Sequence, residues 1–338
     1  MAVTIEDVAR LASVSRQTVS RVINNLQGVK PETRMRVLQA VEKINYYPNI
    51  AARRLASQSV ENIGLVIPFS HEQMATNPFF PQIISAICNA CSERNYGLQI
   101  YSHPRTEEFV PWFSRLYREK HIGGLIIACP DVNERQIVLL QALDIPVIFV
   151  GRPALTVGMS YIDHNIEKIG YQAADYLAAQ GYAGIAMING PSFMTFSQDQ
   201  LAGFKASLTD RRLEYRQEWM LYSDFTEENG FELTRRLIKS NSRPTAIYLV
   251  NDTLTLGALE ALHDEGLQVL KDIELVAGVD RRWGVSIRDS ISAFQLDIPR
   301  LGVTAVKMLM AKMDGNQECM VRIIEAPLIV RNASTKAS

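Results

Sequence analysis

Hydrophobic positions follow two different patterns along this chain of 338 residues. Over roughly the first 45 residues, apolar side chains recur every three or four positions, which is the spacing of amphipathic helices. From residue 63 onward, short continuous apolar runs alternate with further amphipathic stretches. Alternation of this kind indicates parallel β-sheets covered by helices. We therefore predict an α/β protein with a small all-helical head and a larger body.

The apolar runs of the body predict strands, and the amphipathic stretches between them predict helices. Strands are expected at residues 63–69, 98–101, 124–128, 147–150, 185–189, 246–250 and 275–279. Helices are expected at residues 80–95, 107–118, 134–143, 170–180, 197–209, 227–239, 252–265 and 301–313. A break near residues 162–165 divides this series, so we predict two parallel, doubly wound sheets, one after the other.

The start of the head predicts two short helices joined by a tight turn. Thr4 is a suitable N-cap, Asp7 can complete a capping box, and Ser15 caps the second helix. That second helix presents hydrogen-bond donors and no acidic side chain on its free face: Arg16, Gln17, Ser20, Arg21 and Asn24. Base edges and phosphates accept hydrogen bonds, so this face suits a DNA major groove. A solvated helix of an ordinary α-domain is the alternative.

A third helix is expected to complete the head. It follows Lys30-Pro31-Glu32-Thr33-Arg34, and its inward residues are predicted to be Met35, Val37, Leu38, Val41 and Ile44. Residues 1–60 contain nine Lys and Arg against four Asp and Glu, a net charge of +5, whereas the remaining residues carry −6. A basic head on an acidic body indicates that the head alone meets a polyanion.

Several classes of protein are disfavoured by composition. The N-terminal residues lack the basic and apolar regions of a secretory signal, and no apolar run is long enough to span a membrane. Four cysteines in a chain of this length do not form a disulfide framework, and we interpret Cys88 and Cys91 as buried core thiols. We therefore expect a cytoplasmic protein that needs neither a metal nor another cofactor.

Four motifs in the same order carry a resemblance to a known family. They are TIEDVARLASVSRQTVSRVIN, KPETRMRV, NYYPNIAARRLAS and IGLVIP. Together they resemble the LacI/GalR (lactose-repressor/galactose-repressor) family of bacterial transcription regulators, nearest to its maltose-type members. The resemblance covers essentially the whole chain and is strongest in residues 4–56.

The resemblance implies a division of the chain into a helix-turn-helix head and a two-lobed body like that of periplasmic binding proteins. The head would span residues 1–47, a hinge helix and linker 48–60, the body 61–331 and a polar tail 332–338. The first lobe would comprise about 61–162 and 293–324, and the second about 163–292 and 325–331. The tail lacks the leucine-heptad helix that makes the lactose repressor a tetramer, so a homodimer is expected.

A homodimer would place two heads on a near-palindromic double-stranded operator. Arg16 and Gln17 are expected to read base edges, while Arg21 is expected to contact phosphates. Leu55 is predicted to wedge into the minor groove, with packing of a simple linker as the alternative. The full expected set of DNA contacts is Ile5, Ser15, Arg16, Gln17, Ser20, Arg21, Asn24, Thr33, Tyr46, Asn49, Ala52, Arg53 and Leu55.

Polar and aromatic residues follow the predicted strands, where ligands bind in folds of this class. Amides, carboxylates and aromatic faces suit a sugar, although each residue alone could instead cap a helix or pack in the core. The resemblance places Asn251, Asp280 and Phe225 on sugar-contacting positions. The family's arginine ahead of a Gly-aromatic pair is missing, and Arg152 is the candidate for its role. The full expected set is Phe79, Phe80, Arg152, Gln198, Phe225, Asn251 and Asp280.

Two other classes compete with this interpretation. An enzyme would be expected to carry a catalytic or nucleotide-binding motif, but GxGxxG, GxxxxGK[ST], HExxH and GxSxG are all missing, and the five histidines are scattered. A transport-type sugar-binding protein would need an export signal and would leave the basic head without a task. The sequence thus favours a DNA-binding repressor, not an enzyme, that responds to a small carbohydrate-type effector.

Overall fold

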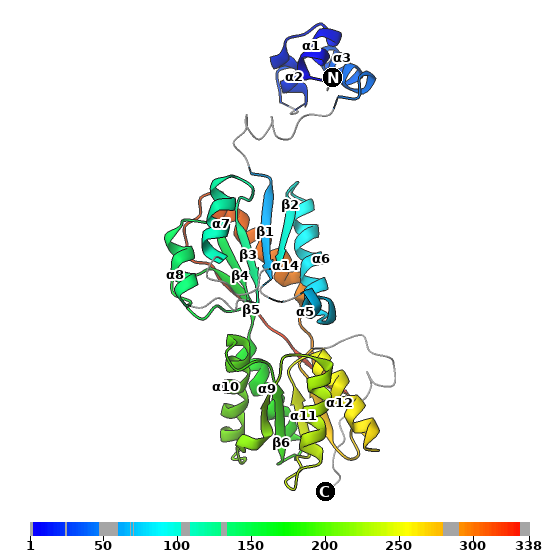
Figure 1. Cartoon of the computed structure of the whole chain (residues 1–338), viewed down its shortest axis with the longest axis vertical. Helices are drawn as coiled ribbons and strands as arrows, with labels where there is room; N and C mark the ends of the chain where they lie inside the picture. Colours follow the sequence, from blue (N-terminus) through cyan, green and yellow to red (C-terminus); the bar gives the residue numbers. More distant parts are fainter. Residues whose placement is uncertain are drawn as a thin grey trace. The chain divides into compact units, whose positions relative to one another are not determined.

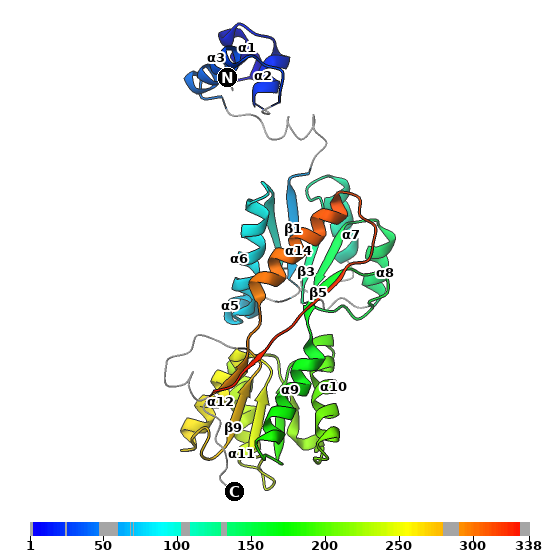
Figure 2. The same cartoon turned by 180° about the vertical axis from the view of Figure 1, so that it is seen from behind.

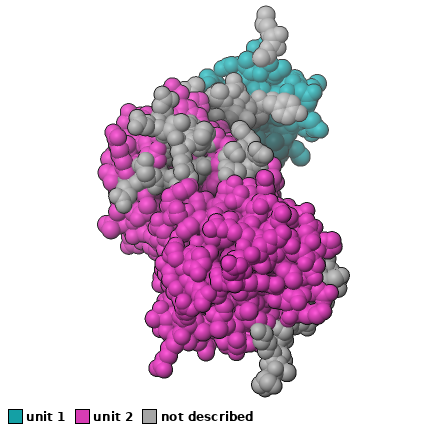
Figure 3. Space-filling model, turned by 60° about the horizontal axis from the view of Figure 1, so that its bottom comes forward, with its two compact units in different colours: residues 1–60 teal, residues 61–338 magenta. Residues whose placement is uncertain are grey.

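The computed structural model describes residues 3–23, 26–46, 60–67, 69, 71–102, 109–129, 134–279 and 291–331. The chain forms two compact units, residues 1–60 and residues 61–338 (Figures 1 and 3). Within these ranges, no helix is both long enough and apolar enough to cross a bilayer. The finer subdivision of the first unit into head and hinge stays a prediction.

The described residues of the first unit form three helices: α1 (Ile5–Ala12), α2 (Arg16–Ile23) and α3 (Pro31–Lys43). The capping box is present, because the Asp7 carboxylate accepts hydrogen bonds from the Thr4 backbone N–H at 3.0 Å and its hydroxyl at 2.8 Å. Ser15 caps α2, since its Oγ accepts from the backbone N–H of Thr18 at 3.1 Å. Val8, Val19 and other small side chains of the three helices pack into one core.

The packing face of α3 differs from the prediction. Met35 and Leu38 are 61% and 51% exposed, whereas Val37 and Ala40 are buried. Val37, Ala40, Val41 and Ile44 lie three and four positions apart, so they form one stripe against α1 and α2. Met35 and Leu38 fall outside that stripe, and the assignment of both to the core was wrong.

The second unit begins with a sheet of six parallel strands in the order β11-β5-β4-β3-β1-β2. Its strands are β1 (Asn62–Ile67), β2 (Gly97–Ser102), β3 (Leu125–Ala128), β4 (Val147–Val150), β5 (Tyr161–His164) and β11 (Val321–Ile324). Helices α6 (Phe79–Ser92) and α14 (Ile298–Met313) pack on one face (Figure 2). Helices α7 (Phe109–Arg118) and α8 (Glu134–Ala142) cover the other face, and α5 (His71–Thr76) packs against α6. These elements form the first lobe.

The second lobe contains another six-stranded sheet, in the order β12-β10-β9-β8-β6-β7. Its strands are β6 (Ile185–Asn189), β7 (Met220–Tyr222), β8 (Ala246–Leu249), β9 (Glu274–Ala277), β10 (Ser292–Phe294) and β12 (Leu328–Ile329). The described part of this lobe contains the helices α9 (Ile166–Ala179), α10 (Thr195–Asp210), α11 (Glu227–Ile238) and α12 (Asp252–Asp264), with a short 3-10 turn, η1 (Gln217–Trp219). The sheet is parallel except at one edge, because β12 pairs antiparallel with β10.

The helices of the second lobe approach one another closely at glycines. A Cβ atom on Gly203 of α10 would lie 1.8 Å from the backbone oxygen of Glu167 in α9. A Cβ atom on Gly257 of α12 would lie 1.9 Å from the backbone oxygen of Glu227 in α11. Only glycine lets these backbones pack at such a separation, so both helix pairs depend on it.

The chain passes between the lobes three times, after β5, after β10 and after β11. Because β10 pairs with β9, the second passage begins after Phe294 rather than at residue 293. The passages are joined to each other and to α9. The Nε2 atom of His164 accepts a hydrogen bond from the backbone N–H of Asp297 at 3.1 Å. Lys168 forms an ion pair with Glu325, 2.8 Å away.

The two-sheet α/β architecture predicted from the sequence is confirmed, while several short strands were missed. Strands β5, β7, β10, β11 and β12 contain two to four residues each, and β11 exposes most of its side chains, so their signal in the sequence is weak. The interpretation of the CxxC pair was half right. Cys91 is buried, and burial raises the pKa of its thiol to about 11, but Cys88 is exposed on α6.

Candidate functional site

The second helix of the first unit exposes the donor face that the sequence predicts. Arg16, Gln17 and Arg21 of α2 are exposed, and Ser20 is half-buried. One acidic side chain does approach this face from α1, because Glu6 forms an ion pair with Arg16 at 3.4 Å. Both partners are well exposed, and such surface pairs contribute about 0–1 kcal/mol. Arg16 can therefore exchange Glu6 for a base or phosphate at little cost.

Arg34 of α3 supports the end of α2, a role the sequence did not suggest. Its guanidinium donates to the backbone oxygen of Leu26 at 2.8 Å and to that of Val22 at 3.5 Å. The last carbonyls of a helix lack partners within the helix, so this contact stabilises the C-terminal end of α2. It also fixes α2 against α3, which sets the direction in which the donor face points.

Apart from Ser15, whose hydroxyl caps α2, the other residues predicted to contact DNA fall into two groups. Ile5 packs against the head core and Tyr46 is only 9% exposed, so both serve the core, and Thr33 is half-buried on α3. The contacts predicted for them stay predictions. The remaining five lie outside the described residues: Asn24, Asn49, Ala52, Arg53 and Leu55.

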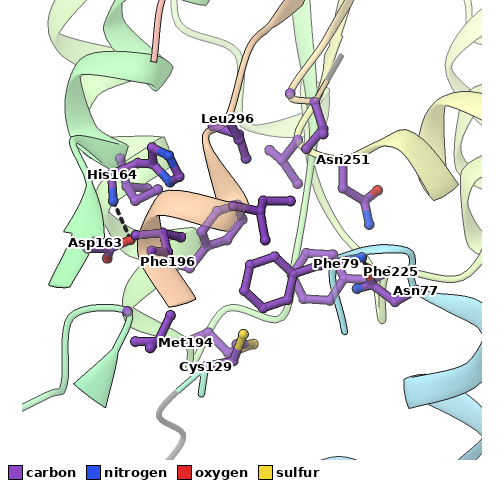
Figure 4. A pocket seen from close by; sticks show the side chains of 18 of the residues that line it. Asn77, Phe79, Cys129, Asp163, His164, Met194, Phe196, Phe225, Asn251 and Leu296 are labelled. Atoms are coloured by element: carbon purple, nitrogen blue, oxygen red, sulfur yellow. Dashed lines mark hydrogen bonds between the residues drawn. The ribbon is translucent and has the colours of Figure 1, made fainter. Parts of the chain in front are cut away.

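A cavity in the second unit lies at the carboxyl ends of strands from both sheets (Figure 4). It encloses about 1070 Å³ of empty space, including the open mouth. The first lobe contributes Asn77, Phe79, Cys129 and the turn after β4, and the second lobe contributes the start of α10, Phe225 and the start of α12. Ligands of open α/β sheets bind at this edge. The cavity therefore has the position of a binding site for a small molecule.

Aromatic rings line much of this cavity. Phe79 and Phe225 both line it (Figure 4), and Phe196 packs edge-on against Phe225 with ring centroids 6.0 Å apart. Phe225 has a positive φ of 68°, and its ring lies directly over Gly190, where any Cβ atom would come within 2.1 Å of it. Phe80 also borders the cavity but is only 2% exposed, so it mainly belongs to the core of the first lobe.

Two asparagines give the cavity its hydrogen-bond character. The Asn251 Oδ1 atom caps α12 by accepting from the backbone N–H of Leu254 at 2.9 Å. Its Nδ2 atom is buried and has no partner among the described residues, and the side chain points into the cavity in Figure 4. Asn77 likewise uses its Oδ1 to accept from the backbone N–H of Phe79 at 3.0 Å. Neither NH₂ group takes part in these caps, and the buried one of Asn251 calls for an acceptor on a ligand.

Arg152 bridges the lobes instead of offering its charge to a ligand. Its Nε and Nη2 atoms donate to the Asp199 carboxylate of α10 at 2.7 and 2.6 Å. Its backbone oxygen accepts from the Thr195 hydroxyl at 2.6 Å, and its backbone N–H donates to Asp163 at 2.8 Å. The hydrogen bonds to Asp199 raise the pKa of Arg152 above its usual value. The role of effector donor predicted for Arg152 is thus limited by a partner that the sequence did not reveal.

Two titratable groups beside Arg152 were not anticipated. Burial raises the pKa of Asp163 to about 7, against the lowering effect of backbone N–H groups of Arg152 and His164. Burial lowers the pKa of His164 to about 4, and its Nε2 atom accepts a hydrogen bond, so His164 is neutral at pH 7. Both residues lie at the end of strand β5. This strand has only four residues, which alternate between half-buried and buried, so it gave little signal in the sequence.

Two members of the predicted effector set do not appear in the described cavity. Gln198 is exposed and donates to the backbone oxygen of Ser192 at 3.3 Å, outside the cavity lining. Gln200, two positions along α10 and so on another face, lines the cavity and accepts from the Tyr248 hydroxyl at 2.9 Å. Asp280 lies outside the described residues, directly after the cavity residue Val279. No cluster of metal ligands occurs in the described parts of the chain.

Comparison with known proteins accounts for both units. Residues 4–49 match the family described as bacterial regulatory proteins, lacI family. Residues 61–332 match the family of periplasmic binding proteins and the sugar binding domain of the LacI family. The chain belongs to the LacI family. It is therefore a DNA-binding transcriptional regulator whose body has the fold of an effector-binding domain.

Curated relatives of this LacI-family protein are repressors, and the similarity extends along almost the whole chain. The HTH-type transcriptional repressor PurR of Vibrio campbellii is 30% identical over 336 residues, covering 98% of this chain and 99% of the relative. The protein of the same name from Aliivibrio fischeri is 29% identical over 334 residues, covering 98% of each chain.

Solved structures agree with the same family. A Lac repressor dimer bound to operator and the anti-inducer ONPF superimposes with a TM-score of 0.86 at 25% identity, covering 99% of both chains. A complex of the transcriptional regulator CelR with cellobiose gives a TM-score of 0.74 at 26% identity, covering 97% of this chain and 99% of that one. The chain thus shares the folds of these regulators along almost its whole length.

Proposed function

We propose that this LacI-family regulator binds a near-palindromic operator as a homodimer, under the control of a small carbohydrate-type effector in the cavity between its lobes. The observation that carries the proposal is the cavity itself, which aromatic rings line together with Asn251, whose buried Nδ2 atom has no partner among the described residues. Leaving a buried donor unsatisfied costs about 1–3 kcal/mol, and a bound acceptor would remove that cost. The proposal places the protein in the cytoplasm, where an operator is accessible, and assigns it no catalytic activity.

On the operator, α2 would lie in the major groove. Arg16 and Gln17 at its start would read base edges, while Arg21 further along would contact phosphates. A bidentate base contact discriminates by about 1–3 kcal/mol, whereas a phosphate contact carries no sequence information. Gln17→Ala should therefore change the preferred sequence. Arg21→Ala should weaken binding to all sequences alike. It should also reduce the slope of log affinity against log salt concentration by about one, because one phosphate contact is lost.

The experiment for this part is a selection from random DNA with the full-length protein and both variants, followed by titrations at several salt concentrations. We expect one palindromic consensus for the parent and for Arg21→Ala, and an altered consensus for Gln17→Ala. An unchanged consensus for Gln17→Ala would refute the assignment of base reading to the start of α2. Gel filtration with light scattering on the same samples tests the dimer.

In the cavity, the apolar face of a sugar ring would lie against Phe79 or Phe225, and its hydroxyl oxygens would accept from Asn251 and Asn77. The same aromatic faces would stack on a flat heterocycle, so nucleobases belong in the screen beside mono- and disaccharides such as cellobiose. Ligands that raise the melting temperature are then titrated by calorimetry. Asn251→Ala should bind the selected ligand at least severalfold more weakly and still bind operator. Equal ligand affinity in Asn251→Ala would place the effector site elsewhere.

A further inference from the structure

The charges around the cavity restrict what kind of effector it can hold. Among the described lining residues, Arg152 is the single Arg or Lys side chain, and His164 is neutral because burial lowers its pKa to about 4. The other titratable side chains that could carry a charge there are Asp163 and Asp252. Among the residues that the structure describes, an anionic ligand would thus depend on Arg152 for a compensating positive charge.

The charge of Arg152 is already neutralised by Asp199. The two side chains form a bidentate pair with distances of 2.7 and 2.6 Å, and each is about a quarter exposed, at 30% and 24%. The Thr195 hydroxyl and the Asp163 carboxyl hold the Arg152 backbone on both sides, so the guanidinium is fixed toward α10. A phosphate or carboxylate would have to displace Asp199 or share Arg152 with it, and either step opposes binding.

Side chains already cap two of the helix N-termini that border the cavity, those of α12 and α6, whereas α10 begins there without a side-chain cap. Negative charge is favoured at helix N-termini mainly because their first N–H groups lack partners. At α12 the N–H of Leu254 is already taken by Asn251, and at α6 the N–H of Phe79 is taken by Asn77. The capping side chains themselves offer a ligand only neutral amide groups, beside aromatic rings.

We propose that the effector of this regulator is an uncharged molecule with acceptor oxygens, such as an unphosphorylated sugar, and that the Arg152–Asp199 pair excludes phosphorylated and carboxylated analogues. The inference rests on the proposed function only in taking this cavity as the effector site. Arg281 and Arg282 follow Val279 in the sequence and lie outside the described residues, so the experiment isolates Arg152 by substitution.

The test uses the full-length protein with glucose 6-phosphate as the probe, titrated by calorimetry at constant ionic strength. Four proteins are compared: the parent, Asp199→Asn, Arg152→Gln and the double variant. Asp199→Asn keeps the size of the side chain and removes its charge, which frees Arg152. We expect Asp199→Asn to bind the probe at least tenfold more tightly than the parent, and the double variant to return to the parent's level.

Two results would overturn the inference. One is a parent protein that binds glucose 6-phosphate in a manner that Arg152→Gln abolishes, and the other is an Asp199→Asn variant with no gain over the parent. Asp199→Ser serves as a second variant, and melting curves of all samples verify folding. Operator titrations of the same variants without ligand test the proposed function separately, because they depend on the first unit and not on the charge of the ligand.

Discussion

The two polar atoms of the Asn251 side chain have different roles, one in folding and one in the proposed ligand binding. Its Oδ1 atom caps α12, and its buried Nδ2 atom has no partner among the described residues. An N-cap of this type stabilises a protein by about 1 kcal/mol. The unsatisfied donor opposes that gain by about 1–3 kcal/mol. The side chain as a whole is therefore expected to contribute little or nothing to the stability of the effector-free protein.

Asn251→Ser keeps a good N-cap and removes the unpartnered NH₂ group, because a serine hydroxyl accepts from the same backbone N–H. We expect the free energy of unfolding of Asn251→Ser to equal that of the parent or to exceed it by up to about 2 kcal/mol, after allowance for lost packing. Asn251→Ala also removes the donor but loses the cap, so it should be about 1 kcal/mol less stable than Asn251→Ser. Both variants should bind a ligand from the sugar screen about tenfold more weakly, since one hydrogen bond is lost.

Urea unfolding followed by tryptophan fluorescence measures these differences. The three tryptophans, at positions 112, 219 and 283, all belong to the second unit, so the signal reports unfolding of the body. An Asn251→Ser protein less stable than the parent by more than about 1 kcal/mol would show that Nδ2 is satisfied in the folded state. The reasoning that links this donor to a ligand would then fail.

Three further predictions concern other parts of the chain. Burial lowers the pKa of His164 to about 4, from a value of 6.5 in the unfolded chain. As the pH falls, the unfolded chain therefore binds a proton before the folded protein does. The free energy of unfolding should fall by up to about 3 kcal/mol between pH 6.5 and 4. Denaturation at each pH should show that His164→Gln removes this loss. Asp163 makes stability change with pH in the opposite direction in both proteins, so the diagnostic quantity is the difference in stability between parent and variant. Identical curves of stability against pH for the two proteins would contradict the prediction. Gly203→Ala should destabilise the body by about 3 kcal/mol or more in urea unfolding, since the new Cβ would lie 1.8 Å from a backbone oxygen of α9, and a loss below about 0.5 kcal/mol would contradict that packing. Arg34→Ala should weaken operator binding without altering ligand affinity, since the C-terminal end of α2 loses its support, and an unchanged operator titration would exclude this role.

Local features of this chain were predictable because they depend on residues close in sequence. The Thr4–Asp7 capping box and the Ser15 cap each involve residues three positions apart, and both are present. The position of the cavity was also predictable, because parallel strands bring their carboxyl ends to one edge whatever their side chains are. Phe79, Phe225 and Asn251 were found by that rule.

Features that depend on tertiary contacts were missed or misassigned. Arg152 was identified, but its partner Asp199 is 47 residues away and belongs to the other lobe, so its neutralisation could not be foreseen. Gln198 was chosen where Gln200 faces the cavity, because an error of two positions in a helix turns a side chain to another face. Met35 and Leu38 were placed in the core by residue type alone, although the packing stripe of α3 runs through Val37 and Ala40.

The central claim, that a ligand in the cavity of the body controls the head on DNA, is tested most directly by reciprocal linkage. Operator affinity of the full-length protein is measured by fluorescence anisotropy with and without a saturating ligand from the screen, and ligand affinity is measured with and without operator. We predict that the two affinities change by the same factor, on the order of 5–150-fold, as thermodynamic coupling requires. An operator affinity that stays constant while a ligand binds in an Asn251-dependent manner would contradict the claim.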